Sequence, residues 1–486
     1  MCCSLMNDGA FRALDKPVRV MDETAAASKS KHRKLNEEQD MDSVACNIDD
    51  LPEAILEHIL SFVPIEDAVA TCVLSKKWRY LWTSHPNLEL FESRFSGREH
   101  FTNFVDGVLL QGSSRIKKLV LRCSNFDYAS RINFWVSTAV ARKVESCSVL
   151  LLWIPGNLVL PYCLFSCATL ARLELCVLPA LELPSRIWLP NLKFLLLKYF
   201  KFVDERSTEQ LLSSPALEEL IIEECNWSNI EALTIRPSML KILTIHDDHD
   251  GFSLVHPYGC RVLICGNNLE RILCRSSFLN DYRFEKSCSL LEACINVTAC
   301  PPSRTRQVAR RLHKLLEATC SVKKLTLSST AVRVLSSAAE LCSHLPIFPN
   351  LKLLVFGRLD LKHQAIVKLL HNSPDLETLE FREGIQRYGI DDGYDAILDP
   401  APHCFGSHLK QIELHNVLMG DEVVRMLELL LKHAMVLEKL LIHHRRTFSW
   451  LGFEESYPKT LPEVHCGSKS FKITILPPDI DKRPLS

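Results

Sequence analysis

Glycine is scarce in this sequence, with 16 residues among 486. Loops that cradle phosphate groups are built largely from glycine, so the chain has little material for a nucleotide site. The sequence also lacks the Gly-x-Ser-x-Gly and His-Glu-x-x-His motifs that mark serine hydrolases and zinc proteases. We therefore expect a chain that is not an enzyme and that needs no cofactor.

Net charge is almost absent as well, because 57 lysines and arginines face 58 aspartates and glutamates. Affinity for a polyanion comes mainly from contacts between phosphates and an excess of basic side chains, so no nucleic-acid partner is expected. A composition of 47% apolar and 24% charged residues is typical of a folded, soluble protein. At this length, several domains or one elongated repeat array are expected.

The 20 cysteines include no Cys-x-x-Cys pair. Neither Cys163 with Cys167 nor Cys260 with Cys265 matches a zinc-binding spacing. The opening segment MCCSLMNDGAFRALDKPVRV lacks the cationic start and apolar core of a secretory signal. Free, buried cysteines in a reducing compartment are therefore expected, and we expect the protein in the nucleus, the cytoplasm or both.

One uncharged run, residues 146–171, is long enough to span a bilayer. Pro155-Gly156-Asn157 and Pro161 divide it into short pieces, and both pieces fit the repeat pattern described below. We expect no membrane contact.

Residues 1–45 are polar and show no periodicity, so this N-terminal tail is expected to be disordered. A small basic cluster in it is compatible with a nuclear import signal or with a solvated run in a loose tail, and both hypotheses stay open. The cluster consists of Lys29, Lys31, His32, Arg33 and Lys34.

A short pattern, apolar-x-x-apolar-x-apolar, recurs from about residue 116 to the end of the chain. Clear copies begin at Leu170, Leu192, Leu217, Leu240, Leu351, Leu376, Leu409 and Leu437, and weaker copies begin at Ile116, Val144, Leu269, Leu290 and Val322. Their starts are 21 to 33 residues apart. About a dozen copies in phase are the signature of leucine-rich repeats, and Cys225 occupies the Asn/Cys position of one copy.

Turn residues stand directly before several copies, as in Pro190-Asn191 and Pro349-Asn350. Proline cannot continue a helix there, so each copy is predicted to start a strand rather than a helical turn. The fold class is therefore α/β: a leucine-rich-repeat solenoid whose leucines point into a shared core beneath a curved parallel sheet.

The residues between the leucines face out of that sheet, because side chains alternate along a strand. They mix both charges with aromatic and aliphatic groups, which favours a protein substrate over a polyanion. The predicted substrate face comprises Arg172, Glu174, Phe194, Lys198, Glu219, Glu223, His246, Arg271, Lys324, Glu380, Arg382, Gln411, Glu413 and His415.

Two polar runs are candidate sites by composition. His246, Asp247, Asp248, His249 and Asp250 follow a strand, but lack the fixed ligand spacing of hard-metal loops, so most should be solvated. The run from His443 to Arg446 is interpreted as a solvated end rather than an anion site. No metal site is predicted.

Residues 50–82, DLPEAILEHILSFVPIEDAVATCVLSKKWRYLW, predict three short helices. Asp50 can cap the first, with Glu53 completing a capping box, and the apolar stripe of this helix runs from Ile55 to Val63. A second helix begins near Glu66, and a third, capped by Ser75, carries Trp78, Leu81 and Trp82 on one face. Helices this short cannot bury so much apolar surface among themselves. Either the first repeats or a second protein covers them.

This stretch resembles an F-box of the plant type through Leu51-Pro52, Ile55-Leu56, Ile59-Leu60, Val63-Pro64, Asp67-Ala68-Val69, Val73-Leu74-Ser75-Lys76, Trp78-Arg79 and Leu81-Trp82. Residues 404–444 resemble the FBD region of plant F-box proteins through Gly420, Glu422, Leu430-Leu431-Lys432, Ala434 and Val436-Leu437-Glu438-Lys439. The expected domains are a tail at 1–45, an F-box at 46–92, leucine-rich repeats at 93–400, FBD-like terminal repeats at 401–470 and a tail at 471–486.

The resemblance implies the substrate-recognition subunit of an SCF-type ubiquitin ligase. The F-box would dock a Skp-type adaptor, and through it a cullin and a RING subunit, while the repeats hold a protein substrate. The implied docking residues are Leu51, Pro52, Ile55, Leu56, Ile59, Leu60, Val69, Leu74, Trp78 and Trp82. Two alternatives stay open: a leucine-rich-repeat scaffold outside any ligase, and a small-molecule-dependent receptor that uses the Skp adaptor without cullin recruitment.

Overall fold

The structure is a computed structural model that divides the chain into two compact units, Met1–Leu51 and Pro52–Ser486. It describes residues 48–112, 114–123, 128–151, 160–177, 181, 183–247, 259–285, 289–298, 300–385, 398–417, 421–444, 467–468 and 471–477. In the first unit, the described residues form one 3-10 turn, η1 (Ile48–Asp50). The predicted tail and its basic cluster lie outside the described residues.

The second unit opens with short helical segments: α1 (Glu53–Leu60), α2 (Ile65–Ala70), η2 (Thr71–Val73) and η3 (Trp78–Ser84). The predicted capping box at the start of the first helix is wrong. Pro52 holds the N-cap position and no side chain caps the helix, because Asp50 belongs to the preceding turn. Ser75 Oγ does accept a hydrogen bond from the backbone N–H of Lys77, at 3.2 Å, but the helix that follows is 3-10.

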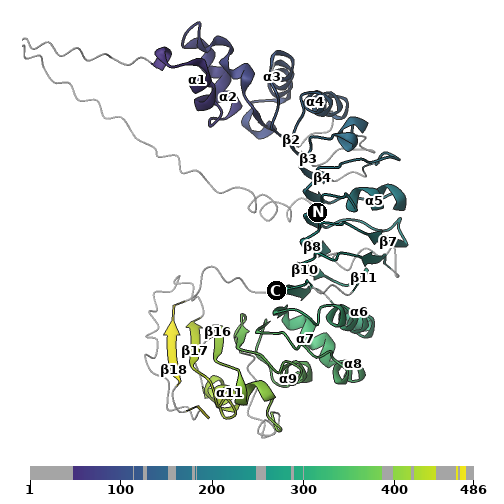
Figure 1. The fold of residues 1–486 in the computed structure, drawn as a ribbon, viewed down its shortest axis with the longest axis vertical. Helices are drawn as coiled ribbons and strands as arrows, with labels where there is room; N and C mark the ends of the chain where they lie inside the picture. The colour runs from purple at the N-terminus through teal and green to yellow at the C-terminus, as the bar shows by residue number, and fades with distance from the viewer. Residues whose placement is uncertain are drawn as a thin grey trace, which may run out of the picture. The chain divides into compact units, whose positions relative to one another are not determined.

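A parallel sheet runs through the rest of this unit, as Figure 1 shows. Its fifteen strands follow chain order, apart from β7, β9 and β11, which belong to a second sheet. The strands are β1 (Asn87–Phe91), β2 (Lys118–Cys123), β3 (Ser146–Leu151), β4 (Arg172–Val177), β5 (Phe194–Lys198), β6 (Glu219–Glu223), β8 (Ile242–Asp247), β10 (Arg271–Ser276), β12 (Glu292–Val297), β13 (Lys324–Leu327), β14 (Leu353–Phe356), β15 (Thr378–Phe381), β16 (Gln411–Val417), β17 (Lys439–His444) and β18 (Lys472–Leu476). Strands were predicted at every strong and weak copy of the repeat, and all are present.

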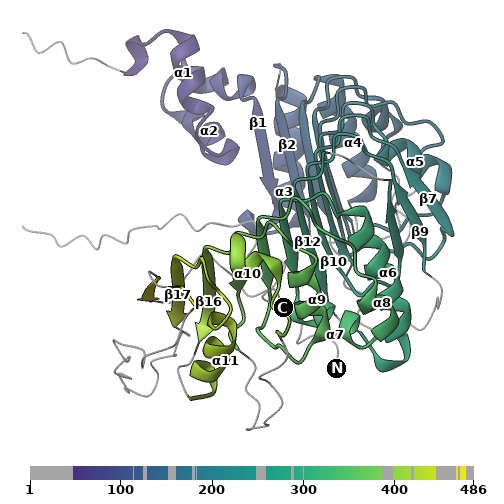
Figure 2. The same ribbon diagram turned by 60° about the horizontal axis from the view of Figure 1, so that its bottom comes forward.

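Helices connect most successive strands and lie along one face of the sheet (Figures 1 and 2). They are η4 (Glu92–Arg94), α3 (Arg98–Gln111), α4 (Ala129–Ala141), η5 (Tyr162–Ser166), α5 (Glu205–Leu212), η6 (Pro302–Arg304), α6 (Thr305–Ala318), α7 (Ser329–Ser336), α8 (Ala339–Ser343), α9 (Gln364–His371), α10 (His403–Ser407) and α11 (Asp421–Leu431). In the middle of the array, the three-stranded sheet of β7 (Ala232–Ile235), β9 (Arg261–Ile264) and β11 (Asp281–Phe284) lies on the same side as α5 and α6. The repeat pattern alone did not predict these return strands.

The leucines of successive repeats stack beneath the sheet. Leu173, Leu195, Leu220 and Leu243 are partners in register on β4, β5, β6 and β8, and each is fully buried. Burying one such side chain is worth about 1.5–3 kcal/mol, so the stack is a principal source of stability. The predicted turn residues also bind between repeats: the side-chain amide of Asn191 donates to the carbonyl of Ala168 at 2.7 Å.

Cys225 confirms the phase of the repeat. It is buried in the Asn/Cys position, and its Sγ–H donates to the carbonyl of Leu197, one repeat earlier, at 3.4 Å. Among the described residues every cysteine is a free thiol, and nine of the fifteen are buried. Burial raises the pKa of the Cys147 thiol to about 12, which is the expected effect of an apolar interior.

The uncharged run at 146–171 belongs to the repeats. Its first residues form β3 and Tyr162–Ser166 form η5, while residues 152–159 lie outside the described part. In the described part of the chain, none of the helices has both the length and the apolar character needed to cross a membrane.

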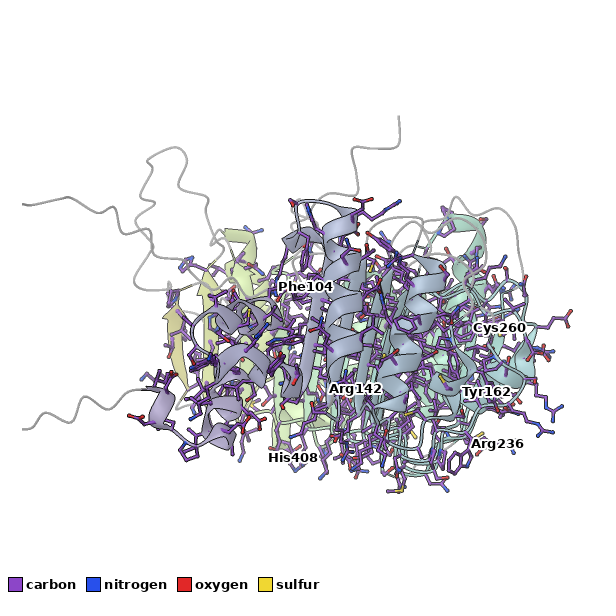
Figure 3. All side chains as sticks on the ribbon, turned by 90° about the horizontal axis from the view of Figure 1, so that it is seen from above. Phe104, Arg142, Tyr162, Arg236, Cys260 and His408 are labelled. Atoms are coloured by element: carbon purple, nitrogen blue, oxygen red, sulfur yellow. The ribbon has the colours of Figure 1, made fainter. Side chains whose placement is uncertain are left out.

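Figure 3 shows the side chains around the labelled Arg142, which follows α4. Its Nε–H donates to the carbonyl of Ser114 at 2.7 Å and so ties the end of α4 to the segment that leads into β2. Partial burial lowers the pKa of this guanidinium. A Cβ on Gly112 would lie 2.7 Å from the Arg142 guanidinium, so this position favours a residue without a side chain.

Candidate functional surfaces

The helices from α1 to η3 have a small core of their own. Leu56 and Leu60 of α1 are buried, as are Trp78, Leu81 and Trp82 of η3, and α1 packs against η3. The indole N–H of Trp82 donates to the carbonyl of Arg79 at 3.1 Å, so its polar atom is satisfied inside this core. The three aromatic and aliphatic residues of η3 therefore share one face, as their spacing predicted.

The first strand of the long sheet covers one side of these helices. α2 packs against β1, whose Leu88 and Leu90 are buried. His85 Nε2 lies 3.1 Å from the carbonyl oxygen of Val63, and Arg94 pairs with Glu66 at 3.5 Å. The alternative in which the first repeats cover the helices is thus correct for their inner side.

Their outer side stays open. Six of the sixteen exposed large hydrophobic side chains among the described residues lie between Ile55 and Tyr80, a concentration that internal packing does not explain. Along α1 and the turn that follows it, they form a row with i, i+4, i+7 spacing: Ile55, Ile59 and Phe62, of which Phe62 is 76% exposed. After α2 come Val73 and Leu74, 83% and 65% exposed, and Tyr80 lies on η3.

The residues predicted to dock a partner differ in their exposure. In the second unit, Pro52, Ile55, Ile59 and Leu74 are exposed and Val69 is half-buried. Leu51, which ends the first unit, is half-buried there. Leu56, Leu60, Trp78 and Trp82 are buried within the chain, where they support the helices. The pairs Ile55-Leu56 and Ile59-Leu60 were predicted to act together. Adjacent helical residues point about 100° apart, so one member of each pair faces inward.

Three exposed residues were missed. Phe62 could have been found from the sequence, because it continues the spacing of Ile55 and Ile59 by one helical step. Val73 and Tyr80 carry no such signal, since their exposure depends on how η2 and η3 turn after α2. The surface formed by Ile55, Ile59, Phe62, Val73, Leu74 and Tyr80 is called the helical apolar surface below.

Comparison with known proteins places these helices in a defined module: residues 48–90 match the F-box domain. An F-box/LRR-repeat protein from Arabidopsis thaliana is 33% identical over 358 residues, which are 70% of this chain and 74% of the relative. The chain belongs to the F-box/LRR-repeat family. An Arabidopsis F-box/FBD/LRR-repeat protein is 26% identical over 427 residues, 83% of this chain and 93% of the relative, in keeping with the FBD-like region.

The other surface of this F-box/LRR-repeat chain is the open face of the sheet. Its charged residues pair across neighbouring strands. Glu223 of β6 is 2.9 Å from Lys198 of β5 and 3.4 Å from His246 of β8, and Glu292 lies between Arg271 and Lys324 in the same way. The bonds from His246 and Lys198 lower the pKa of Glu223 to about 2, despite partial burial acting in the opposite direction.

Near the start of the array, Arg172 and Phe194 also lie on this open face. The Arg172 guanidinium stacks over the Phe194 ring at 3.4 Å and binds Glu174 at 2.6 Å. A planar cation held between a carboxylate and an aromatic ring offers both a charge and an apolar flank, a combination typical of protein-binding surfaces. The predicted residues in this part of the face are thus exposed or half-buried, as expected.

The C-terminal part of the predicted face differs. Glu380, Glu413 and His415 lie on the expected strands but are buried, with 3%, 8% and 2% of their surface exposed. His443 and His444 are buried too, so the interpretation of a solvated end is wrong for them, and Arg445 and Arg446 lie outside the described residues. The polar groups of Glu380, Glu413, His415 and His443 contact one another across β15, β16 and β17, which removes them from solvent.

The run from His246, which begins within β8, is also less solvated than expected. His246 pairs with Glu223 on the open face, whereas Asp247 is buried and accepts hydrogen bonds from Asn280 and Tyr282. Asp248, His249 and Asp250 lie outside the described residues. Asp247 is therefore a structural residue that joins two sheets. Its partners lie more than 30 residues away along the chain, and no local pattern points to them.

Proposed function

We propose that this chain is the substrate-recognition subunit of an SCF-type ubiquitin ligase, with no catalytic role of its own. The observation that supports this most directly is the helical apolar surface. It stays exposed although the same helices have a core and pack against β1, so a second protein is the natural cover. We infer that this protein is a Skp-type adaptor, which links the chain to a cullin and a RING subunit.

The open face of the sheet supports a protein substrate. Lys198, Arg271 and Lys324 each bind a carboxylate on a neighbouring strand, so a polyanion would meet a negative charge beside each of these cations. We therefore place substrate contacts around Arg172, Phe194, Glu219 and Arg271, where the face remains accessible. We propose that the protein acts in the nucleus, the cytoplasm or both, where a reducing environment would keep its many free cysteines unpaired.

The test is co-purification of a Skp-type adaptor and a cullin with the full chain. In the variant Phe62→Ala/Leu74→Ala, adaptor binding should fall tenfold or more, because exposed apolar anchors carry much of the energy of such interfaces. Ile347→Ala is the matched control, since Ile347 is 65% exposed, as Leu74 is, but lies in the repeats. Equal binding by wild type and the double variant would exclude this docking surface. Adaptor binding without cullin would favour the non-ligase alternatives.

A further inference from the structure

A compact polar cluster lies where β15, β16 and β17 meet. Glu380 of β15 is the register partner of Glu413 on β16, and the register between β16 and β17 shifts between Leu414 and Val417. Asn416 lies within that irregularity with a φ of 56°, and its side-chain amide donates to the carbonyl of Arg382 at 2.7 Å. Such bulges bend a strand and redirect neighbouring side chains. Here the bulge lies next to His415.

Three ligand-type side chains converge in this cluster. His415 Nε2 and His443 Nε2 each lie 3.1 Å from the same atom, Glu413 Oε1. The two imidazole rings stack with their centroids 4.3 Å apart and their planes 15° apart. All three candidate ligand atoms lie within 4.8 Å of one another, and all three residues are buried. In a tetrahedral zinc site, ligand atoms about 2.0–2.2 Å from the metal are about 3.3 Å apart, close to two of these separations.

The hydrogen bonding of His443 supports a cation between these atoms. Its Nδ1 lies 3.2 Å from the carbonyl oxygen of Pro477, just after β18. A carbonyl only accepts, so Nδ1 carries the proton, and in the neutral ring Nε2 then presents a lone pair. That lone pair faces Glu413 Oε1, so either a second ring proton or a metal ion must lie between the two atoms. A metal-binding histidine typically donates its other N–H to a carbonyl in this way.

We propose that Glu413, His415 and His443 bind a divalent zinc ion. Two imidazoles and one carboxylate are the donor set that zinc accepts, whereas calcium and magnesium prefer oxygen ligands alone. Glu380 lies beside these three ligands, with its Oε1 3.5 Å from His415 Nε2, and a water molecule would complete four ligands. Arg382 binds the same oxygen at 3.0 Å and holds this carboxylate in place. The ion would join β16 to β17, and through Pro477 to β18.

The test begins with the wild-type full chain, stripped with a chelator and dialysed against zinc. Inductively coupled plasma mass spectrometry should find one zinc ion per chain. Added zinc should raise the melting temperature of the chain, whereas added magnesium should not. Cobalt substituted for zinc should give the visible bands of a four-coordinate site without thiolate-to-cobalt absorption. That absorption would place the metal on cysteines and overturn the proposal, as would a wild type that binds no zinc.

Variants then locate the site. His443→Gln and Glu413→Gln should each weaken zinc binding tenfold or more, with circular dichroism confirming the fold. His444→Gln is the matched control, because His444 is equally buried on the same strand but points to the opposite face. If His443→Gln misfolds, Glu413→Gln, which keeps the side-chain shape, decides. Zinc binding that neither His443→Gln nor Glu413→Gln weakens would contradict the site.

Discussion

The hydroxyl group of Tyr282 donates a hydrogen bond to Asp247 Oδ2, at 2.7 Å, in the interior of the repeat array. Asn280 Nδ2 donates to the same oxygen, also at 2.7 Å. Asp247 ends β8 of the long sheet and Tyr282 lies in β11 of the three-stranded sheet, so the bond joins the two sheets. Burial, and next the charge of Asp247, raise the pKa of Tyr282 well above its usual value, so the hydroxyl remains a donor.

Removing this donor should destabilise the repeats. Tyr282→Phe keeps the ring but leaves a buried carboxylate with one bond fewer, which costs about 1–3 kcal/mol. Urea unfolding followed by circular dichroism measures the loss. Tyr162→Phe serves as the control, because Tyr162 is 55% exposed and should change stability little. Equal stability of the two variants would show that the Asp247 bond contributes nothing.

A second prediction concerns acid stability through Glu223. The pKa of Glu223 is about 2 in the folded chain, first because of its bond with His246 and then because of Lys198, against a usual value of 4.5. Since the folded pKa is lowered, the stabilisation is fully present above about pH 4.5 and is lost as pH falls toward about 2. As pH falls over this range, the urea concentration at the unfolding midpoint should therefore decrease less for Glu223→Gln than for the wild type.

The control for this measurement is Glu340→Gln, because the Glu340 side chain is 89% exposed and its ion pair with Arg306 is screened by solvent. Its acid profile should follow the wild type. A Glu223→Gln profile as steep as that of the wild type would mean that the cross-strand pairs contribute no acid-dependent stability.

Local patterns predicted the fold well because each repeat encodes its own strand. Leu217 to Trp227 contains the leucines, the strand and Cys225 in one stretch, and neighbouring repeats supply the same parts. The buried cluster at Glu413 could not be predicted in this way. Its partners Glu380 and His443 lie about 30 residues away on either side, and only the register of β15, β16 and β17 brings them together. The same holds for Asp247 and Tyr282.

The F-box shows a different limit of sequence reasoning. Ile55 and Leu56 are adjacent and equally apolar, and only the packing of α1 on η3 decides which one is buried.

Leu56→Ala should therefore cost about 2–5 kcal/mol of stability, as expected for a cavity in a core. Leu74→Ala should change stability by less than about 0.5 kcal/mol while weakening adaptor binding. Urea unfolding and an adaptor titration of both variants separate the two roles. Similar losses of stability would show that Leu74 also packs internally.

The free thiols give a probe of the proposed docking surface in the unmodified chain. Burial raises the pKa of Cys147 to about 12 and that of Cys225 still further, so neither should react with iodoacetamide near pH 8. Cys72 is half-buried in η2, directly before the exposed Val73 and Leu74, and should react faster than either of these two buried thiols. A bound Skp-type adaptor should then slow the alkylation of Cys72, as peptide mass spectrometry can measure.

Cys320, half-buried just after the helix α6, is the control and should react equally with and without the adaptor. If the adaptor binds and Cys72 reacts as fast as before, η2 is not part of the interface, and docking must rest on Ile55, Ile59, Phe62 and Tyr80.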